Sequence, residues 1–457
     1  MSPEHQLVTW NVAVAAFLVG VGLAAFGGPL EVRLLLWLIT LASIWLACTR
    51  TVGTMHPISI YVLASSVYVL AAAIEIVAFG NRLDLDVGRM GQLTDAGVGF
   101  LLCAAIGHVV VTATCRPATA RLRQPSLWAA AQDAQVAVNV CIALCTVSVA
   151  MTVQRYGLAI GTLTRAELYA DEYVLLSLVR GVVTLSLAAT AALIVNAEAL
   201  GRTRLSALRW RLLAALAAYV AADLVLLGDR RLPLIAVIAV ATVMRPRRFT
   251  WRQSTAVAAG VALLIVYGLV RNTPPGEWAS VLSGGDLLPA LSPAANEFGG
   301  MAIIGGALET LDSTPRDFPG YLDAFTQILP RSIVTDRPLS PTEWFVSTYF
   351  PFFAEIGASF AFNAVIEAFL NGGVLMIAIA GSTTGAFIAG LSLVRWRGAP
   401  IGVPIAAYIF TFSMRMDLAS QLRTAIVALA GLAVLLSLIN IGRMVRLGGL
   451  KRRELVQ

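Results

Sequence analysis

The chain has few charged residues for its length of 457. Only 13% of the residues are charged, whereas 58% are hydrophobic and the mean hydropathy is +0.80. This balance excludes a typical soluble globular protein. Because a helix satisfies its own backbone in lipid, the composition predicts an all-α polytopic membrane protein.

Cysteine and histidine are also scarce. The five cysteines lie in or beside apolar segments without the spacing of a metal site, so we interpret them as packing residues and expect no disulfide. The three histidines, His5, His56 and His108, share no short motif with a carboxylate or a cysteine. Residues 271–370 hold no Asp-x-Asp pair. We therefore expect no metal and no cofactor, and the absence of that pair disfavours a metal-bound nucleotide sugar.

Long hydrophobic runs, in contrast, are abundant. About 20 apolar residues cross a bilayer, and this criterion predicts about twelve transmembrane helices. The first is taken as a span and not as a removed signal. The runs are residues 7–27, 33–49, 57–79, 96–114, 135–153, 174–198, 212–228, 232–244, 254–270, 372–394, 401–416 and 420–441. The predicted organisation is nine spans within residues 1–270, one large loop at 271–370, and three spans with a basic tail at 371–457.

The distribution of arginine predicts the orientation of the spans. One alternating assignment collects 19 of the 33 basic residues on one side, together with only four of the 26 acids. Since basic residues are retained in cytoplasmic loops, both termini are expected in the cytoplasm. Topology and contact with anionic lipid explain these basic clusters, so no nucleic acid is expected as a partner. The loop at 271–370 then lies on the extracytoplasmic side.

This loop differs in composition from the rest of the chain. It contains ten of the 19 prolines, together with carboxylates, arginines and aromatic residues. Residues 297–310 and 321–329 are each predicted to form a short amphipathic helix on or in the membrane surface. Loops of such length are more often functional than plain connections. We expect any chemistry to occur here.

Seven arginines at or near the predicted outer surface are not needed to fix the topology. A charge beside a span is costly and is commonly paired or functional. Local ion pairs, for example with Asp223 and Asp229 or around Asp417, explain them as well as an anion site does. A guanidinium matches phosphate oxygens bidentately and stays charged when desolvated. The seven are Arg230, Arg231, Arg271, Arg331, Arg337, Arg415 and Arg423.

Several short segments occur in a characteristic order. They are Gly228-Asp229-Arg230, Arg271, Leu329-Pro330-Arg331, Glu367-Ala368-Phe369-Leu370-Asn371-Gly372-Gly373, and Arg415-Met416-Asp417 with Arg423. Their order and predicted sidedness resemble the bacterial oligosaccharide repeat-unit polymerases, the Wzy-type O-antigen polymerase family. The resemblance covers roughly residues 150–440 by motif and the whole chain by topology. Met416 departs from the glycine expected between the arginine and the aspartate.

The resemblance implies a GT-C-like, metal-independent membrane glycosyltransferase in the bacterial inner membrane. It would transfer a growing glycan from undecaprenyl diphosphate to the non-reducing-end sugar of an incoming lipid-linked repeat unit, outside the cytoplasm. Donor and acceptor lipids, and a chain-length regulator protein, would be its partners. The seven arginines would stabilise the diphosphate as its charge develops. A carboxylate would serve as general base. The candidates are Glu297, Glu367, Glu355 and Asp336.

Three other functions fit parts of the same pattern. A lipid-linked oligosaccharide flippase or other transporter shares the plan of twelve spans, but the chain has no duplicated halves and no matched pair of broken spans. An O-antigen ligase would use the same donor, and for it we expect a histidine in the large loop, which has none. A purely structural membrane protein is the remaining alternative.

Overall fold

The computed structural model describes residues 3–25, 28–81, 84–115, 127–157, 174–201, 205–227, 231–244, 300–308, 317–329, 334, 336–355 and 362–454. These residues are almost entirely helical and contain no β-strand, only an isolated bridge between Trp396 and Ala399. The prediction of an all-α protein is confirmed. The chain divides into two compact units, which are residues 1–115, 279–390 and 409–423, and residues 116–278, 391–408 and 424–457.

Seven described helices are long and apolar enough to cross a membrane, which supports a multi-pass membrane protein. The predicted number of twelve spans is not confirmed. Two further predicted spans coincide with shorter apolar helices, and residues 254–270 lie outside the described residues. The seven helices are Leu30–Val52, Pro57–Phe79, Val87–Cys115, Ala129–Tyr156, Leu178–Gly201, Ala364–Leu393 and Leu418–Met444.

The predicted span at 401–416 has a different structure. It contains α18 (Gly402–Phe410), a helix of nine residues, followed by the 3-10 turn η3 (Ser413–Arg415). At 1.5 Å per residue, α18 extends about 14 Å, roughly half of the hydrocarbon core of a bilayer. The apolar run is interrupted because the chain turns at Ser413 and begins a new helix at Leu418.

The first unit is built on five long helices. They are α1 (Pro3–Ala25), α2 (Leu30–Val52), α3 (Pro57–Phe79), α4 (Val87–Cys115) and most of α17 (Ala364–Leu393). A Cβ atom at Gly385 would lie 1.7 Å from the Ala104 carbonyl oxygen, and one at Gly107 would lie 2.2 Å from that of Ser382. Small residues on both helices therefore let the backbones of α4 and α17 pack in direct contact, as is common within membranes.

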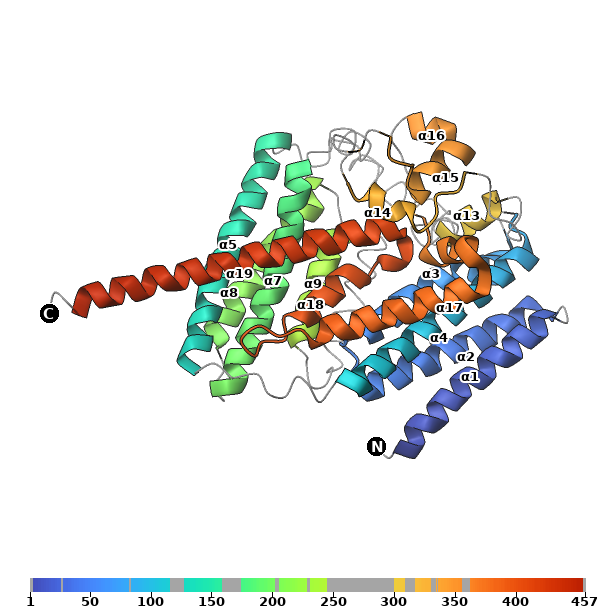
Figure 1. Cartoon of the computed structure of the whole chain (residues 1–457), viewed down its shortest axis with the longest axis horizontal. Coiled ribbons are helices and arrows are strands. Elements are labelled where there is room, and N and C mark those ends of the chain that lie inside the picture. Colours follow the sequence, from blue (N-terminus) through green and yellow to red (C-terminus); the bar gives the residue numbers. More distant parts are fainter. Residues whose placement is uncertain are drawn as a thin grey trace, which may run out of the picture. The chain divides into compact units, whose positions relative to one another are not determined.

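Four short helices from the large loop complete this unit. They are α13 (Gly300–Ala307), α14 (Asp323–Gln327), α15 (Pro341–Tyr349) and α16 (Pro351–Glu355). Figure 1 shows α13, α15 and α16 near the end at which α17 begins. Buried Met301, Ile304, Trp344, Phe345 and Ile366 belong to one hydrophobic core that joins α13, α15 and α17 to α3 and α4. The loop segments are thus packed onto the helix bundle.

Both predicted amphipathic helices are present, although only one exposes an apolar face. Within 297–310, α13 buries Met301, Ile304 and Leu308 against the first unit, instead of lying on a surface. Within 321–329, α14 leaves Leu322 and Phe325 exposed. The difference arises because α13 packs on α3 and α4, which supply an apolar partner for its face.

The second unit contains α5 (Leu127–Tyr156), α7 (Val174–Gly201), α8 (Ser206–Leu227), α9 (Arg231–Met244), most of α18 and the greater part of α19 (Leu418–Glu454). Helices α5, α7 and α8 lie side by side (Figure 1).

A buried ion pair joins two of these helices. The carboxylate of Asp223 on α8 accepts hydrogen bonds from the Arg180 guanidinium on α7 at 2.8 to 3.2 Å. Arg180 therefore balances the charge of Asp223.

Candidate functional site

The first half of α17 carries a polar stripe that ends at a break in the helix. The Asn363 side chain caps the helix by accepting the Val365 N–H at 2.8 Å. Glu367 and Asn371 follow at intervals of four residues, so they lie on one face, and Asn371 donates to the Glu367 carbonyl oxygen at 2.8 Å. Gly373 then adopts φ +60° and ψ −147°, which interrupts the helix inside a predicted span. Only glycine adopts this conformation readily.

The start of α19 brings a second carboxylate to Glu367. Asp417 caps this helix by accepting the Ser420 N–H at 2.7 Å, and its other oxygen accepts the Thr342 hydroxyl at 2.7 Å. The Leu418 N–H donates to Glu367 Oε2 at 2.8 Å. The two carboxylates thus share one helix N-terminus, where the unpaired N–H groups and the helix dipole favour negative charge.

These two carboxyl groups are buried, and they have no basic partner among the residues that the structure describes. Glu367 is 1% exposed and Asp417 is 0% exposed. Neither forms an ion pair with any residue in the described part of the chain, and their charges repel each other. Glu367 Oε1 is buried and accepts no hydrogen bond from a described residue. Glu367 Oε1 can therefore accept a hydrogen bond from a hydroxyl group, or a proton.

Two of the predicted arginines converge on a single carbonyl oxygen close to this pair in the fold. Arg337 donates through Nη1 to the Gln327 oxygen at 2.9 Å, and Arg423 donates to the same oxygen through Nε at 3.2 Å. Arg337 also donates to the Leu329 oxygen at 3.1 Å and contacts Glu343 at 3.5 Å. Arg423 has no acidic partner among the described residues. The two guanidinium groups and one carboxylate leave an excess of positive charge.

The first turn of α15 connects the arginines with the carboxylates. Ser340 and Glu343 form a capping box, in which each side chain accepts the backbone N–H of the other. Glu343 then faces Arg337, while its neighbour Thr342 faces Asp417. The first turn of α15 therefore contacts both Arg337 and Asp417. A negative ligand near Arg423 and an acceptor near Glu367 would meet in the same part of the first unit.

Tyr321, just before α14, closes another side of the cluster. Its backbone N–H donates to Asn371 Oδ1 at 3.0 Å, which joins the loop to the break in α17. Burial raises the pKa of the Tyr321 phenol well above its usual value, and the nearby Glu367 charge raises this pKa further. Tyr321 is therefore neutral at physiological pH and can donate a hydrogen bond.

Comparison of the chain with protein families, curated proteins and solved structures gave no match. The cluster combines a cationic fork, a buried carboxylate pair and a neutral phenol, which suits the transfer of a group away from an anionic leaving group.

The other predicted site residues lie elsewhere or outside the described residues. Glu355 on α16 and Asp336 in a turn are both exposed and take no part in the cluster. The Arg415 guanidinium lies over the Tyr68 ring, with its Cζ atom 5.8 Å from the ring centre. Arg231 begins α9, and its side chain is outside the described set. The remaining predictions outside the described residues are Glu297, Arg230, Arg271 and Arg331.

Asn371, Asp417 and Gln327 are among the polar residues of the cluster that were not predicted as site residues. Asn371 preceded two glycines inside an apolar run, which indicates a break, and Asp417 preceded the last apolar run as an N-cap residue does. Gln327 is fully buried, donates to the Leu339 oxygen at 2.8 Å and keeps Oε1 without a described partner. No sequence signal distinguishes Gln327, because its role depends on the approach of two distant arginines.

Proposed function

We propose that this chain is a GT-C-like membrane glycosyltransferase that polymerises lipid-linked oligosaccharide repeat units on the outer side of a bacterial cytoplasmic membrane. The donor is a growing glycan on undecaprenyl diphosphate, and the acceptor is a single repeat unit on the same lipid. The observation that carries the proposal is the convergence of Arg337 and Arg423, 86 positions apart in sequence, beside the buried pair Glu367 and Asp417.

The proposed reaction is a substitution at the anomeric carbon of the donor sugar. An oxygen of the acceptor sugar forms a bond to that carbon, and its proton passes to a protein carboxylate. The bond between the anomeric carbon and the diphosphate oxygen breaks, and undecaprenyl diphosphate leaves with the electron pair. No oxidant, reductant or further reactant is required.

In this reaction the arginines stabilise the leaving group. Its negative charge rises as the bond to the sugar breaks, so preorganised cations act most strongly in the transition state. Arg423 suits this role because its guanidinium contacts only a carbonyl oxygen among the described residues and has no carboxylate to neutralise it. Arg337 adds a second guanidinium from the loop. Their planar forks match phosphate oxygens in pairs.

Glu367 is the proposed general base. Of the candidate carboxylates that the structure describes, it alone is buried, and its Oε1 atom is without a hydrogen bond from a described residue. Asp417 is held by the Thr342 hydroxyl and the Ser420 N–H, and it acts as a positioning residue at the start of α19, where the Leu418 N–H contacts Glu367. General base catalysis of this kind typically contributes about 10² to 10⁴ in rate.

The test is to delete the gene in its host and to separate the surface glycans by size. The proposal predicts a ladder that collapses to one repeat unit, which returns to full length when the gene is restored. A normal ladder after deletion would overturn it. Complete loss of lipid-linked repeats outside the membrane would instead indicate a transporter.

A further inference from the structure

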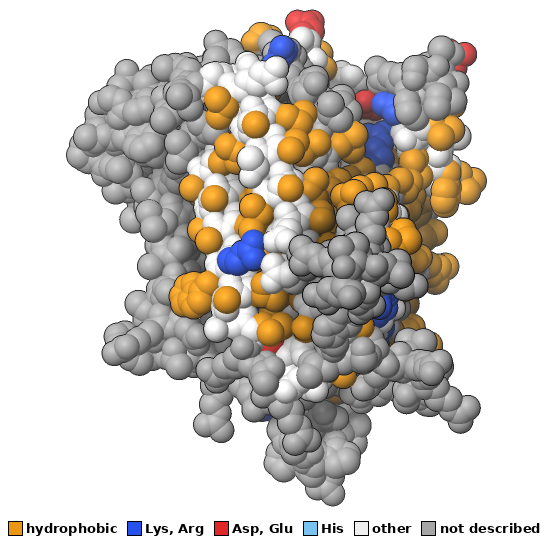
Figure 2. Space-filling view, turned by 90° about the vertical axis from the view of Figure 1, so that its left-hand side faces the viewer, with side chains coloured by type: hydrophobic (Ala, Val, Ile, Leu, Met, Phe, Trp, Pro, Cys, Tyr) orange, Lys and Arg blue, Asp and Glu red, His pale blue; other side chains and the backbone are white. Residues whose placement is uncertain are grey.

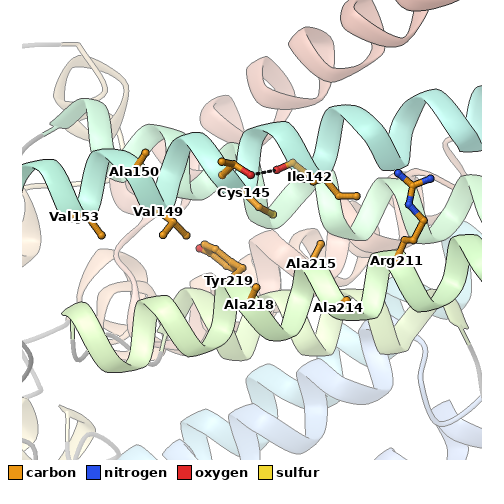
Figure 3. A pocket seen from close by; sticks show the side chains of 11 residues that line it. Ile142, Cys145, Val149, Ala150, Val153, Arg211, Ala214, Ala215, Ala218 and Tyr219 are labelled. Atoms are coloured by element: carbon orange, nitrogen blue, oxygen red, sulfur yellow. Dashed lines mark hydrogen bonds between the residues drawn. The ribbon is translucent and has the colours of Figure 1, made fainter. Parts of the chain in front are cut away.

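A groove of about 600 Å³ lies between α5 and α8 in the second unit, whereas the residues proposed for polymerisation belong to the first unit. Figure 3 shows side chains of both helices lining it along their length. Its lining is hydrophobic except for Thr146, Tyr219 and Arg211. Grooves of this size accommodate small organic ligands.

Small residues on α8 create the groove. Ala214, Ala215 and Ala218 line its α8 side, and none of them can fill the space beside the larger residues of α5. The floor is fixed by Tyr219, which is fully buried and donates to the Arg180 carbonyl oxygen at 3.3 Å. The groove is therefore a consequence of side-chain volume on a packed pair of helices, since α5 and α8 contact each other directly.

The groove lies on a helix that the apolar composition places in a membrane. Residues Ala129–Tyr156 of α5 form one of the seven candidate spans, and Val147 on the same helix is 49% exposed. Figure 2 shows that the described surface on the side of α5 and α8 carries mainly hydrophobic side chains. A groove open on such a surface is in contact with lipid chains, and not with bulk water.

One end of the groove differs from the rest because it carries a charge. Arg211 stands at that end, opposite to Val153 (Figure 3). Its Nη2 atom donates to Asn139 Oδ1 at 2.9 Å, and it forms no ion pair with a described residue. Trp210 beside it is 71% exposed. Exposed tryptophan and arginine side by side are typical of the level of the lipid headgroups.

The length of the groove matches one leaflet. Its lining on α5 extends from Ile142 to Val153, a rise of roughly 16 Å at 1.5 Å per residue. Half of a hydrocarbon core of about 30 Å is about 15 Å. A chain that starts at the level of Arg211 and Trp210 would thus lie in the groove over about the depth of one leaflet.

We propose that this groove binds an acyl chain of an anionic phospholipid whose headgroup phosphate contacts Arg211. The apolar lining contacts the chain, and the guanidinium contacts the phosphate as a charge-assisted hydrogen-bond donor. Arg211 is one of the 19 basic residues that the predicted orientation of the spans places on the cytoplasmic side, so the lipid occupies the inner leaflet. This proposal does not depend on the proposed polymerisation. It means that the second unit holds a bound lipid.

The experiment measures lipid retained by the purified full-length protein by native mass spectrometry. The detergent contains either phosphatidylglycerol or phosphatidylcholine with the same acyl chains. Ala218→Leu and Ala214→Leu place a larger side chain in the groove. Ala217→Leu is the matched control, because Ala217 is exposed on the same helix but does not line the groove. Arg211→Ala removes the charge and leaves the apolar lining in place.

We expect the wild type to retain phosphatidylglycerol in preference to phosphatidylcholine. Ala218→Leu and Ala214→Leu should each weaken retention of phosphatidylglycerol about tenfold, equivalent to about 1.4 kcal/mol, whereas Ala217→Leu should not. Arg211→Ala should remove the preference between the two lipids. Equal retention in wild type and both groove variants, or no preference in the wild type, would overturn the proposal. Unchanged size-exclusion profiles of the variants establish that folding is intact.

Discussion

The two units bury charge in opposite ways. In the second unit the Arg180 guanidinium faces both oxygens of Asp223, at 2.8 to 3.2 Å, so a cation and an anion satisfy each other. In the first unit Glu367 lies beside another carboxylate, and Arg337 shares a carbonyl oxygen with Arg423. Like charges are thus gathered there in two adjoining groups.

Under the proposed function, this difference separates a structural arrangement from a functional one. A buried ion pair neutralises its own charge and leaves nothing for a ligand to complete. Groups of like charge raise the free energy of the folded protein, so a protein that keeps them gains something other than stability. A diphosphate would neutralise the positive charge of Arg337 and Arg423. A proton from a hydroxyl group would neutralise one of the two carboxylates. Substitutions at the two places should therefore have different consequences.

The largest expected effect is on activity at Glu367. Glu367→Gln keeps an oxygen that accepts the Leu418 N–H but removes the base, so polymerisation should fall by about 10² to 10⁴. The assay follows product length from lipid-linked repeat units, with purified protein in proteoliposomes. Glu31→Gln, at an exposed position on α2, is the control and should retain full activity. Wild-type activity in Glu367→Gln would remove the proposed base.

The next effect is on stability at the ion pair of the second unit. Arg180→Ala leaves Asp223 buried without this partner and should destabilise the protein by about 3 to 5 kcal/mol. The double variant Arg180→Met with Asp223→Leu removes both charges and should recover most of the loss. The thermal stability of the single and the double variant is measured in detergent, with size-exclusion chromatography used to monitor unfolding. Equal losses in the single and double variants would contradict the explanation that the loss comes from an unpaired buried charge.

A smaller effect is expected at the break in α17. Gly373→Ala forces a side chain into φ +60° with no atom within 4 Å of the new Cβ, so the cost is that of the backbone alone, about 1 to 3 kcal/mol. Gly390→Ala, on the same helix and with equally open surroundings, should instead stabilise the protein by about 0.5 to 1 kcal/mol. Thermal unfolding of the two variants compares them directly. Similar shifts for both would show that the break does not depend on Gly373.

The smallest effect is a dependence on alkaline pH at Tyr321. A tyrosine in the unfolded chain ionises near pH 10, whereas burial and Glu367 raise the pKa of Tyr321 in the folded protein. The resulting stabilisation is present below about pH 10 and decreases as pH rises above it. The melting temperature of the wild type should thus fall more steeply between about pH 9.5 and 11.5 than that of Tyr321→Phe. Parallel curves of melting temperature against pH for the two proteins would contradict the raised pKa of Tyr321.

Much of the fold followed from the hydrophobic pattern. The runs at 57–79 and 174–198 match α3 and α7 almost residue for residue, because a span needs only length and low charge. The run at 401–416 does not form one continuous helix, which was not predicted because apolar composition does not reveal where a chain turns. Its interruption follows from η3 and from Gln421, whose side chain donates to the Ser413 and Met416 oxygens at 3.1 and 3.0 Å.

The site was predictable only in its residue types. Glu367, Arg337 and Arg423 were candidates from the sequence, and the structure places all three in the first unit. That Glu367 meets Asp417, or that both arginines meet at Gln327, depends on long-range packing that no local pattern encodes. The exposure of Glu355 and Asp336 is likewise a tertiary property, which composition alone cannot give.

The central claim, that Arg423 stabilises the diphosphate leaving group, has one direct test. The glycan ladder of cells that carry Arg423→Ala is compared with that of Arg50→Ala, which removes an exposed arginine of the same unit. The account predicts that Arg423→Ala collapses the ladder to one repeat unit at a normal protein level, a loss of about 10² to 10³ in rate, while Arg50→Ala keeps the full ladder. A full-length ladder in Arg423→Ala would contradict it.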